Sequence, residues 1–413
     1  MRISLRRRLA TAATALGLTT LGVLGAGAAP AQAAPADCPA GYFCAWKTDN
    51  ATGTMYKTNV DAPTLGAWDN QFRSVSNRTG KYACLHDDPD LGYNGDVWSV
   101  APDPAGTEWG GPGSTTVSSV RLVTTERECG GYEPYPYWYA GPQATTPAFG
   151  DLNGDKTADV LARDKAGRLW FLPGDGSGTL VGSGGWNAMN ALTRHGDFSG
   201  DGKEDVIARE ASTGKLWLYK GSGTGSVGSR VLIGSGGWNS MNQLTAFGDL
   251  TGDGRSDLLA VEKSTGKLWL YPGTATGPLG ARKLLGSGGW NAMNALVAPG
   301  DLNGDGKADL LAREASTGKL WRYPTKPGAL GSRLLVGSGW NVMKTFVGIG
   351  NVEYGDPNDL LTITGSGAST SLTGNSCAGA GCMMVYPGKG TGGLNPGYGL
   401  DGDYNWDDMN AVF

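Results

Sequence analysis

The feature that most constrains this chain is an internal repeat that begins near residue 145 and runs to the C-terminus. Five copies of an acidic segment start at Asp151, Asp197, Asp249, Asp301 and Asn351, at intervals of 46, 52, 52 and 50 residues. Each copy is followed by an apolar run, a polar turn, a Leu-Trp segment and a further short apolar run, which indicates about four strands per unit. Four-stranded units at this period predict a β-propeller.

The composition supports an all-β fold. Glycine accounts for 70 of the 413 residues, and glycine is costly inside helices but useful in tight turns. A β-solenoid is the alternative, and it is disfavoured because its coils are usually shorter than these units. Five blades is the plain count. The terminal segment 409–413 resembles another copy of the innermost strand, so a sixth blade completed by residues 132–144 is left open.

The first 33 residues are predicted to be a secretory signal peptide. Arg6, Arg7 and Arg8 precede an apolar stretch that runs to Ala29, and a small-residue cleavage site follows at Ala31-Gln32-Ala33. General secretory and twin-arginine export both remain open. No later stretch approaches the roughly 18 apolar residues that span a bilayer. We expect a secreted, extracellular protein.

The net charge of the mature chain makes one class of partner unlikely, and the composition shifts along the chain indicate its domains. Cleavage removes four arginines and leaves 30 basic and 38 acidic residues, so the net charge becomes 30 − 38 = −8, which makes nucleic acid an unlikely partner. We expect a monomer with a small β domain over residues 34–130, a Pro/Tyr-rich linker over 131–144 and the propeller over 145–413.

Six cysteines in an exported chain favour disulfides over metal thiolates. Four lie in the N-terminal domain, where their pairing cannot be deduced from the sequence alone. The other two are close in sequence, within an insertion at residues 365–381 of the last repeat, and we expect them to close a loop there. The cysteines are Cys38, Cys44, Cys84 and Cys129 in the first group and Cys377 and Cys382 in the second.

The acidic segments have the spacing of calcium loops. The pattern D-x-[DNST]-x-D-x-x-x-D places oxygen ligands at positions one, three, five and nine, with a backbone carbonyl at position seven. The predicted ligands are Asp151, Asn153, Asp155, Thr157 and Asp159; Asp197, Ser199, Asp201, Lys203 and Asp205; Asp249, Thr251, Asp253, Arg255 and Asp257; and Asp301, Asn303, Asp305, Lys307 and Asp309, where Thr157, Lys203, Arg255 and Lys307 act through their carbonyls.

We expect about four Ca²⁺ ions, one per intact loop, because three clustered carboxylates repel one another unless a cation neutralises them. Position twelve is alanine, so the loops are not EF-hands, and Mg²⁺ is disfavoured because it prefers to keep waters. The fifth loop has Gly355 at position five, and we expect weak or no binding there. The alternative is a set of Asx-stabilised turns without metal.

The acidic segments, with the following Leu-Leu-Ala and Leu-Trp-x-Tyr strands, resemble FG-GAP (VCBS) repeats over residues 145–413. The resemblance implies calcium-loop propeller units of the kind found in extracellular recognition proteins.

A second repeated segment, GSGGWN, places a Trp-Asn pair at each connection between blades. The aromatic ring and the amide are suited to a sugar, but a repeated tryptophan in a propeller is also a common packing residue. The segment resembles the loops of tachylectin-type propeller lectins, which implies binding of N-acetylated hexosamines, and five such sites would favour a polymeric or cell-wall glycan. The candidates are Trp186/Asn187, Trp238/Asn239, Trp290/Asn291, Trp340/Asn341 and Trp406/Asp407.

The N-terminal segment from Cys38 to Trp46, with the later segments 70–75 and 117–120, resembles a bacterial secreted βγ-crystallin-like family that includes a streptomycete metalloproteinase inhibitor. Two Greek-key halves are implied. The calcium pattern of that family is broken here, because Arg73-Ser74 follows Asp69-Asn70 without the expected hydroxyl pair, so we expect no strong calcium site in this domain.

No catalytic residues are expected. The chain has only two histidines, neither with a credible nucleophile or metal partner, and its acids follow the repeat rather than break it. Two hypotheses follow. The chain is a calcium-binding propeller lectin, or it is a secreted peptidase inhibitor, of metalloproteases first, whose propeller serves as a targeting module.

Overall fold

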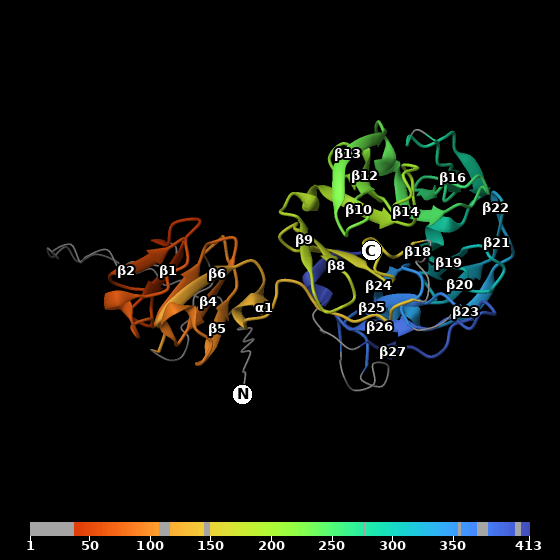
Figure 1. Ribbon diagram of the computed structural model, residues 1–413. Helices are drawn as coiled ribbons and strands as arrows, with labels where there is room; N and C mark the ends of the chain where they lie inside the picture. Colours follow the sequence, from red (N-terminus) through yellow and green to blue (C-terminus); the bar gives the residue numbers. More distant parts are fainter. Residues whose placement is uncertain are drawn as a thin grey trace, which may run out of the picture. The chain divides into compact units, whose positions relative to one another are not determined.

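The computed structural model describes residues 37–106, 116–143, 149–275, 277–353, 357–369, 379–400 and 406–413. The chain divides into two compact units, one up to Pro134 and one from Tyr135 to Phe413 (Figure 1). The predicted signal peptide, Cys377 and Gly355 lie outside the described residues. Within these ranges no helix is both long and apolar enough to cross a membrane.

The first unit is a small β domain built from two three-stranded sheets of like topology, ordered β2-β1-β3 and β5-β4-β6, with the first strand of each in the middle. Phe43, Phe72, Leu85 and Val120 form the centre of its core. Its elements are β1 (Phe43–Trp46), β2 (Met55–Thr58), η2 (Gly66–Trp68), β3 (Ser74–Asn77), β4 (Tyr82–His86), η3 (Pro89–Leu91), β5 (Val97–Val100), β6 (Ser119–Val123) and α1 (Glu126–Cys129).

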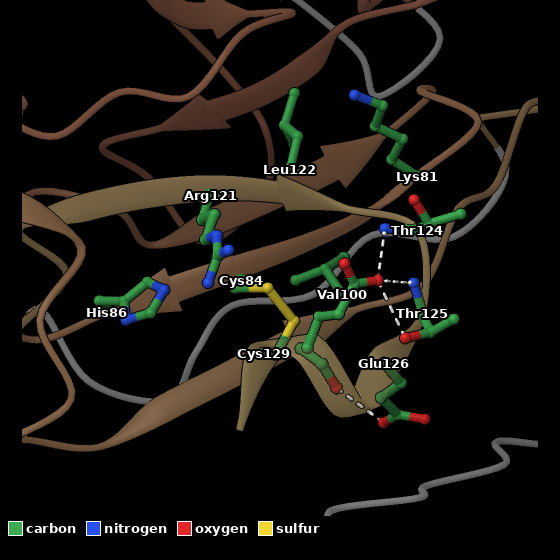
Figure 2. The surroundings of a disulfide bond; sticks show 12 residues. Lys81, Cys84, His86, Val100, Arg121, Leu122, Thr124, Thr125, Glu126 and Cys129 are labelled. Carbon is green, nitrogen blue, oxygen red and sulfur yellow. Dashed lines mark hydrogen bonds between the residues drawn. A yellow bond between two sulfur atoms is a disulfide. The ribbon is translucent and has the colours of Figure 1, made fainter. Parts of the chain in front are cut away.

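Two disulfides staple this unit, Cys38–Cys44 and Cys84–Cys129. The second joins β4 to α1 (Figure 2), where the Glu128 carboxylate accepts the Thr125 N–H at 2.7 Å and so caps the helix. In the second unit Cys382 is also disulfide-bonded, and its expected partner lies outside the described residues.

The second unit is a β-propeller whose described residues contain five four-stranded antiparallel sheets, arranged around a common centre (Figure 1). We number these blades in chain order. Their strands are, in the first blade, β28 (Met409–Val412), β7 (Val160–Asp164), β8 (Leu169–Leu172) and β9 (Thr179–Gly182); in the second, β10 (Met189–Arg194), β11 (Val206–Glu210), β12 (Leu216–Gly221) and β13 (Val227–Gly234); in the third, β14 (Met241–Gly248), β15 (Asp257–Glu262), β16 (Leu268–Tyr271) and β17 (Lys283–Gly286); in the fourth, β18 (Met293–Gly300), β19 (Asp309–Glu314), β20 (Leu320–Tyr323) and β23 (Leu334–Gly337); and in the fifth, β24 (Met343–Val347), β25 (Leu360–Thr364), β26 (Met383–Tyr386) and β27 (Tyr398–Gly399). A short hairpin, β21 (Thr325–Lys326) and β22 (Ala329–Leu330), extends the fourth.

A single 3-10 turn precedes the innermost strand of each blade, and each of these turns begins at the tryptophan of the Trp-Asn segment or of its last copy. They are η4 (Trp186–Ala188), η5 (Trp238–Ser240), η6 (Trp290–Ala292), η7 (Trp340–Val342) and η8 (Trp406–Asp408).

The C-terminal strand completes the first blade. Strand β28 pairs with β7, with Val412 opposite Ala162 and Met409 opposite Asp164. The segment 409–413 is therefore the innermost strand of the first sheet. This pairing joins the two ends of the repeat region and so closes the ring of blades.

Residues 135–143 pack with the propeller rather than forming a linker. Trp138 is buried and donates from Nε1 to the Leu172 carbonyl at 3.3 Å, and the Ala140 N–H donates to the Gly174 carbonyl at 2.8 Å. The expected linker over 131–144 is thus too long. The Pro/Tyr composition that suggested a linker supplies buried aromatic contacts here.

The blades pack through apolar faces, and their innermost strands surround a narrow central cavity of about 110 Å³. Leu192, Leu244, Leu296 and Phe346 line it from four successive inner strands. Neighbouring inner strands also bond to each other, since the Ala246 N–H donates to Thr193 Oγ1 at 2.9 Å. Strand faces apolar on both sides are expected where each sheet is covered by two others.

Candidate metal loops and inter-blade sites

The two repeated motifs lie at opposite ends of the innermost strands. In the third blade, Trp238 lies just before β14, and the acidic loop begins at Asp249, directly after the strand ends at Gly248. The same order recurs in the second, fourth and fifth blades, while in the first blade Trp406 precedes β28 and the acidic loop precedes the next strand of the sheet, β7. The propeller therefore has an acidic-loop end and a Trp-Asn end.

The acidic loops share one backbone scaffold. In the third loop, Asp257 at position nine is fully buried and accepts the Leu250 N–H at 2.9 Å. Asp249 at position one accepts the N–H groups of Gly252 at 2.6 Å and Gly254 at 2.7 Å. The first and last carboxylates therefore hold the turn itself, and their remaining lone pairs stay free for a ligand.

Position six of these loops needs a left-handed backbone. It is glycine in the second, third and fourth loops, with φ of 82° at Gly202 and 83° at Gly254. In the first loop Lys156 adopts φ of 73°, a conformation that is uncommon for a residue with a side chain. The turn is thus imposed on the first loop by its surroundings.

The second loop gathers three carboxylates. Oxygens of Asp197, Asp201 and Asp205 lie within 4.8 Å of one another, and this is the one group of three or more His, Cys, Asp or Glu found among the described residues that could hold a metal ion. Burial raises the pKa of Asp205, and the neighbouring Asp197 and Asp201 raise it further. A set of hard oxygen donors with unneutralised charge fits Ca²⁺.

The first loop has a buried carboxylate, Asp159, with an unusual environment. Burial raises the pKa of Asp159 to about 8, and Asp155 and Asp151 add to the effect. Its Oδ1 atom is buried with no hydrogen-bond partner. Arg194 lies nearby, but it donates to the Asp159 carbonyl and pairs with Glu204 at 3.0 Å rather than binding the carboxylate.

The expectation of three gathered carboxylates in every intact loop is wrong for the first, third and fourth loops, because only the second forms such a group. In the fourth, the position-nine carboxylate of Asp309 contacts Arg322 Nη1 at 3.1 Å. In the fifth, Asp359 keeps the scaffold bond from the Val352 N–H at 2.9 Å, although Asn351 replaces the first carboxylate.

The five predicted tryptophans are buried between blades. Each of the first four packs its ring on a tyrosine in the third strand of the blade whose innermost strand it precedes, as Trp238 does on Tyr271 with ring centroids 4.5 Å apart. The other pairs are Trp186 and Tyr219 at 4.6 Å, Trp290 and Tyr323 at 4.9 Å, and Trp340 and Tyr386 at 4.6 Å, while Trp406 is 1% exposed. The packing interpretation therefore fits these rings better than sugar stacking.

The asparagines that follow the first four tryptophans brace a hairpin of the preceding blade. Asn239 Nδ2 donates to the Ala211 carbonyl at 2.8 Å, in the turn between β11 and β12. Asn187, Asn291 and Asn341 make the equivalent bond to the carbonyls of Lys165, Lys263 and Ala315, at 2.8 to 3.1 Å. One donor of each amide is therefore already used within the propeller.

Asp407 departs from this arrangement. It takes the asparagine position in the last copy and lies exposed in η8, whereas the neighbouring Trp406 is buried. A carboxylate has no hydrogen to donate, so an ionised Asp407 cannot make the hairpin bond of the four asparagines. Its other neighbour, Asp408, pairs with Lys165 Nζ at 2.6 Å. The structure therefore disagrees with the prediction of Trp406 and Asp407 as a ligand pair, because only Asp407 is exposed.

One of the connections between blades borders a pocket. Between the fourth and fifth blades, a pocket of about 340 Å³ is lined by the loop from Gly337 to Trp340 and by the turn between β26 and β27. Ser338, Tyr386, Lys389 and Asn395 supply its polar atoms. The repeat pattern did not indicate Lys389 and Asn395 as site residues, because they lie in a turn that differs from the corresponding turns of the other repeats.

Two family models match parts of the chain, one in each unit. Residues 31–100 match the model of peptidase inhibitor family I36, and residues 197–260 and 249–312 match the FG-GAP-like repeat. The two expected resemblances are confirmed. No curated protein matches the chain.

Similar solved structures include a lectin of Agrocybe aegerita, described as recognising non-reducing terminal N-acetylglucosamine, with 14% identity and a TM-score of 0.36 over 92% of this chain and 96% of that one. A luciferin-regenerating enzyme has 10% identity and a TM-score of 0.35 over 65% and 78% of the two chains. The Dos1 propeller has 11% identity and a TM-score of 0.28 over 59% and 71%.

Proposed function

We propose that this chain, which combines a domain of peptidase inhibitor family I36 with FG-GAP-like repeats, is a secreted calcium-binding recognition protein whose propeller binds a glycan. The pocket between the fourth and fifth blades is the observation that carries the glycan part of the proposal. Secretion rests on the N-terminal signal sequence and on the disulfides, which form in oxidising compartments.

The pocket has the size and lining of a small carbohydrate site. Its volume of about 340 Å³ lies in the usual range for small ligands. Trp340 and Tyr386, which pack on each other, give the pocket only a small apolar surface, while Ser338 and Asn395 offer hydrogen-bonding groups for hydroxyl or acetamido substituents. Lys389 adds a positive charge that favours an acidic sugar. N-acetylated cell-wall glycans combine these features.

Calcium has a structural role in this proposal. Asp197, Asp201 and Asp205 hold one ion in the second loop, and Asp159 provides an open buried acceptor in the first. A bound Ca²⁺ supplies positive charge that offsets the repulsion among these carboxylates and orders the acidic-loop end.

Binding of the mature protein to a glycan array, to chitin and to peptidoglycan, in calcium and then in chelator, tests the proposal. Ser338→Trp fills the pocket and should abolish binding, while Ser287→Trp, at the corresponding position of the preceding blade, should retain it. Equal glycan binding by the two variants would show that this pocket is not the glycan site. Absence of any glycan binding in calcium would overturn the lectin proposal.

A second function is favoured by the family match of residues 31–100. We propose that the N-terminal domain inhibits a secreted peptidase, with metallopeptidases the first class to test. The full mature chain should inhibit such an enzyme, and a protein that starts at Tyr135 should lose inhibition but keep glycan binding. Equal inhibition by both proteins would contradict this assignment.

A further inference from the structure

One position in the third strand of the blades differs in chemistry between repeats. The repeated Leu-Trp segment continues with Phe171, Leu218 and Leu270 in the first three blades, and with Arg322 in the fourth. All of these strands occupy the third place in their sheets. Sequence alone marks Arg322 as the one cation at an otherwise apolar position.

The apolar residues at this position pack beneath a glycine turn of the following blade. A Cβ atom placed on Gly225 would lie 2.3 Å from the Phe171 ring, and one on Gly392 would lie 2.1 Å from Arg322 Cζ. The same turns cover the acidic loops, because the Gly225 N–H donates to the Leu152 carbonyl and the Gly392 N–H to the Leu302 carbonyl. Arg322 is therefore held directly beside the fourth loop.

The Arg322 guanidinium binds the last carboxylate of that loop. Nη1 lies 3.1 Å from Asp309 Oδ2, and the two side chains are 6% and 0% exposed. Asp309 Oδ2 also accepts the Leu302 N–H at 3.1 Å, while Oδ1 accepts Asn303 Nδ2 at 3.4 Å. Both oxygens of this position-nine ligand already have donors.

Among the described residues, no basic side chain pairs with the position-nine carboxylate of the second or the third loop. Asp205 Oδ1 accepts the Gly221 N–H at 2.9 Å, and Asp257 Oδ1 accepts the Gly273 N–H at 3.0 Å. These donors are neutral, so the carboxylate charge is left for an added ion to balance. In the fourth loop a fixed guanidinium both neutralises the carboxylate and repels a divalent cation at short range.

We propose that Arg322 is a built-in counter-cation that takes the place of calcium in the fourth loop, so that this loop is ordered without metal. The inference rests on the proposed calcium binding by the other loops. The chain then has two kinds of acidic loop, metal-dependent ones and one that is neutralised by its own side chain.

Calcium titration of the full mature chain, by calorimetry and by equilibrium dialysis, tests this. Arg322→Leu restores the residue of the sister blades and should bind one more Ca²⁺ than the wild type, or bind it at least tenfold more tightly at the fourth loop. Leu218→Arg is the reciprocal variant in the second blade, and it should lose the ion from the second loop. Unchanged stoichiometry and affinity in both variants, beside a wild type that binds calcium, would overturn the inference.

Thermal unfolding separates this failure from failure of the calcium proposal. In chelator Arg322→Leu should unfold at a lower temperature than the wild type, because Asp309 is left buried without its partner, and calcium should restore the loss. A wild type that binds no calcium would contradict the proposed function. In that case a loss in Arg322→Leu that calcium does not restore would identify Arg322 as a structural partner only, and would overturn the inference too.

Discussion

The two ends of the propeller use their repeated polar and aromatic residues in opposite ways. At the Trp-Asn end, Trp238 is buried on Tyr271 and Asn239 bonds to a neighbouring hairpin, so internal packing occupies both residues. At the acidic-loop end, oxygens of Asp197, Asp201 and Asp205 lie within 4.8 Å of one another, and no ion pair to them is found among the described residues. Repetition alone thus does not distinguish a packing motif from a binding motif. The distinction lies in whether each group already has a partner.

Truncation of a buried tryptophan should have the largest effect on the free energy of unfolding. Trp238→Ala removes a buried ring between two blades, and we expect the free energy of unfolding to fall by about 3–5 kcal/mol, as for other large-to-small core changes. Urea denaturation measures this. A variant of nearly unchanged stability that loses glycan binding would instead make Trp238 a ligand residue, and the contrast between the two ends would disappear.

The acidic-loop end should also be the acid-sensitive end, because it contains His195. This imidazole is buried and stacks on Phe149 at 3.7 Å, and among the described residues neither ring nitrogen has a hydrogen-bond partner. Burial lowers its pKa to about 3. The unfolded chain binds a proton near the ordinary pKa of about 6.5, whereas the folded protein does not. The contribution of His195 to the free energy of unfolding should therefore fall as the pH drops from 6.5 toward 3. The raised pKa of Asp159 contributes with the opposite sign, so a His195 variant is needed to isolate the histidine.

The expected slope from this group is up to about 1.4 kcal/mol per pH unit. His195→Phe, which introduces the residue found at Phe247 in the next repeat, should flatten the profile in that interval. Melting curves in calcium from neutral to acid pH give the comparison with the wild type. Parallel profiles for the two proteins would exclude His195 as the source of acid sensitivity.

Replacing one predicted calcium ligand tests the acidic-loop end by itself, and its energetic effect should be smaller than that of Trp238→Ala. Asp201→Asn keeps the size of an exposed side chain but removes one carboxylate of the second loop, and calcium affinity there should fall at least tenfold, or about 1.4 kcal/mol. The matched control is Asp175→Asn, because Asp175 stabilises a similar exposed turn through Ser177 outside the acidic loops. Equal calcium binding by the variant and the control would mean that the second loop is only a turn.

The smallest effect on the free energy of unfolding is expected for Asn239, the residue that follows the buried Trp238. Asn239→Ala removes one exposed side-chain hydrogen bond, and the free energy of unfolding should fall by about 1 kcal/mol or less. The ratio to the Trp238→Ala loss measures how unequally the two residues contribute to packing. Comparable losses from both would show that the hairpin bond, rather than the ring, holds the connection.

Much of the fold was predictable because the repeat fixes strand number and order. The same repeat also located the acidic loops. It did not indicate which tryptophan faces are covered, because the covering tyrosine lies two strands further along the chain. It also did not reveal that Trp138 bonds to the Leu172 carbonyl instead of lying in a linker. Arg322 is visible in the sequence as an exception, but its partner Asp309 follows only from the pairing of β19 with β20. Contacts between residues of different strands or blades depend on tertiary structure, which no local pattern records.

Thermal unfolding of the mature protein in saturating calcium and in chelator, with bound calcium measured on the same samples, tests the central claim most directly. At a free calcium concentration of about 100 times the Kd of a site, the ion bound there adds about 2.7 kcal/mol to the free energy of unfolding. If the acidic loops bind calcium, the samples should contain bound calcium and the melting temperature of the propeller should rise clearly. Both effects should be lost in chelator and reduced in Asp201→Asn. Identical melting in both conditions, with no calcium bound, would contradict this prediction and leave the acidic segments as metal-free turns.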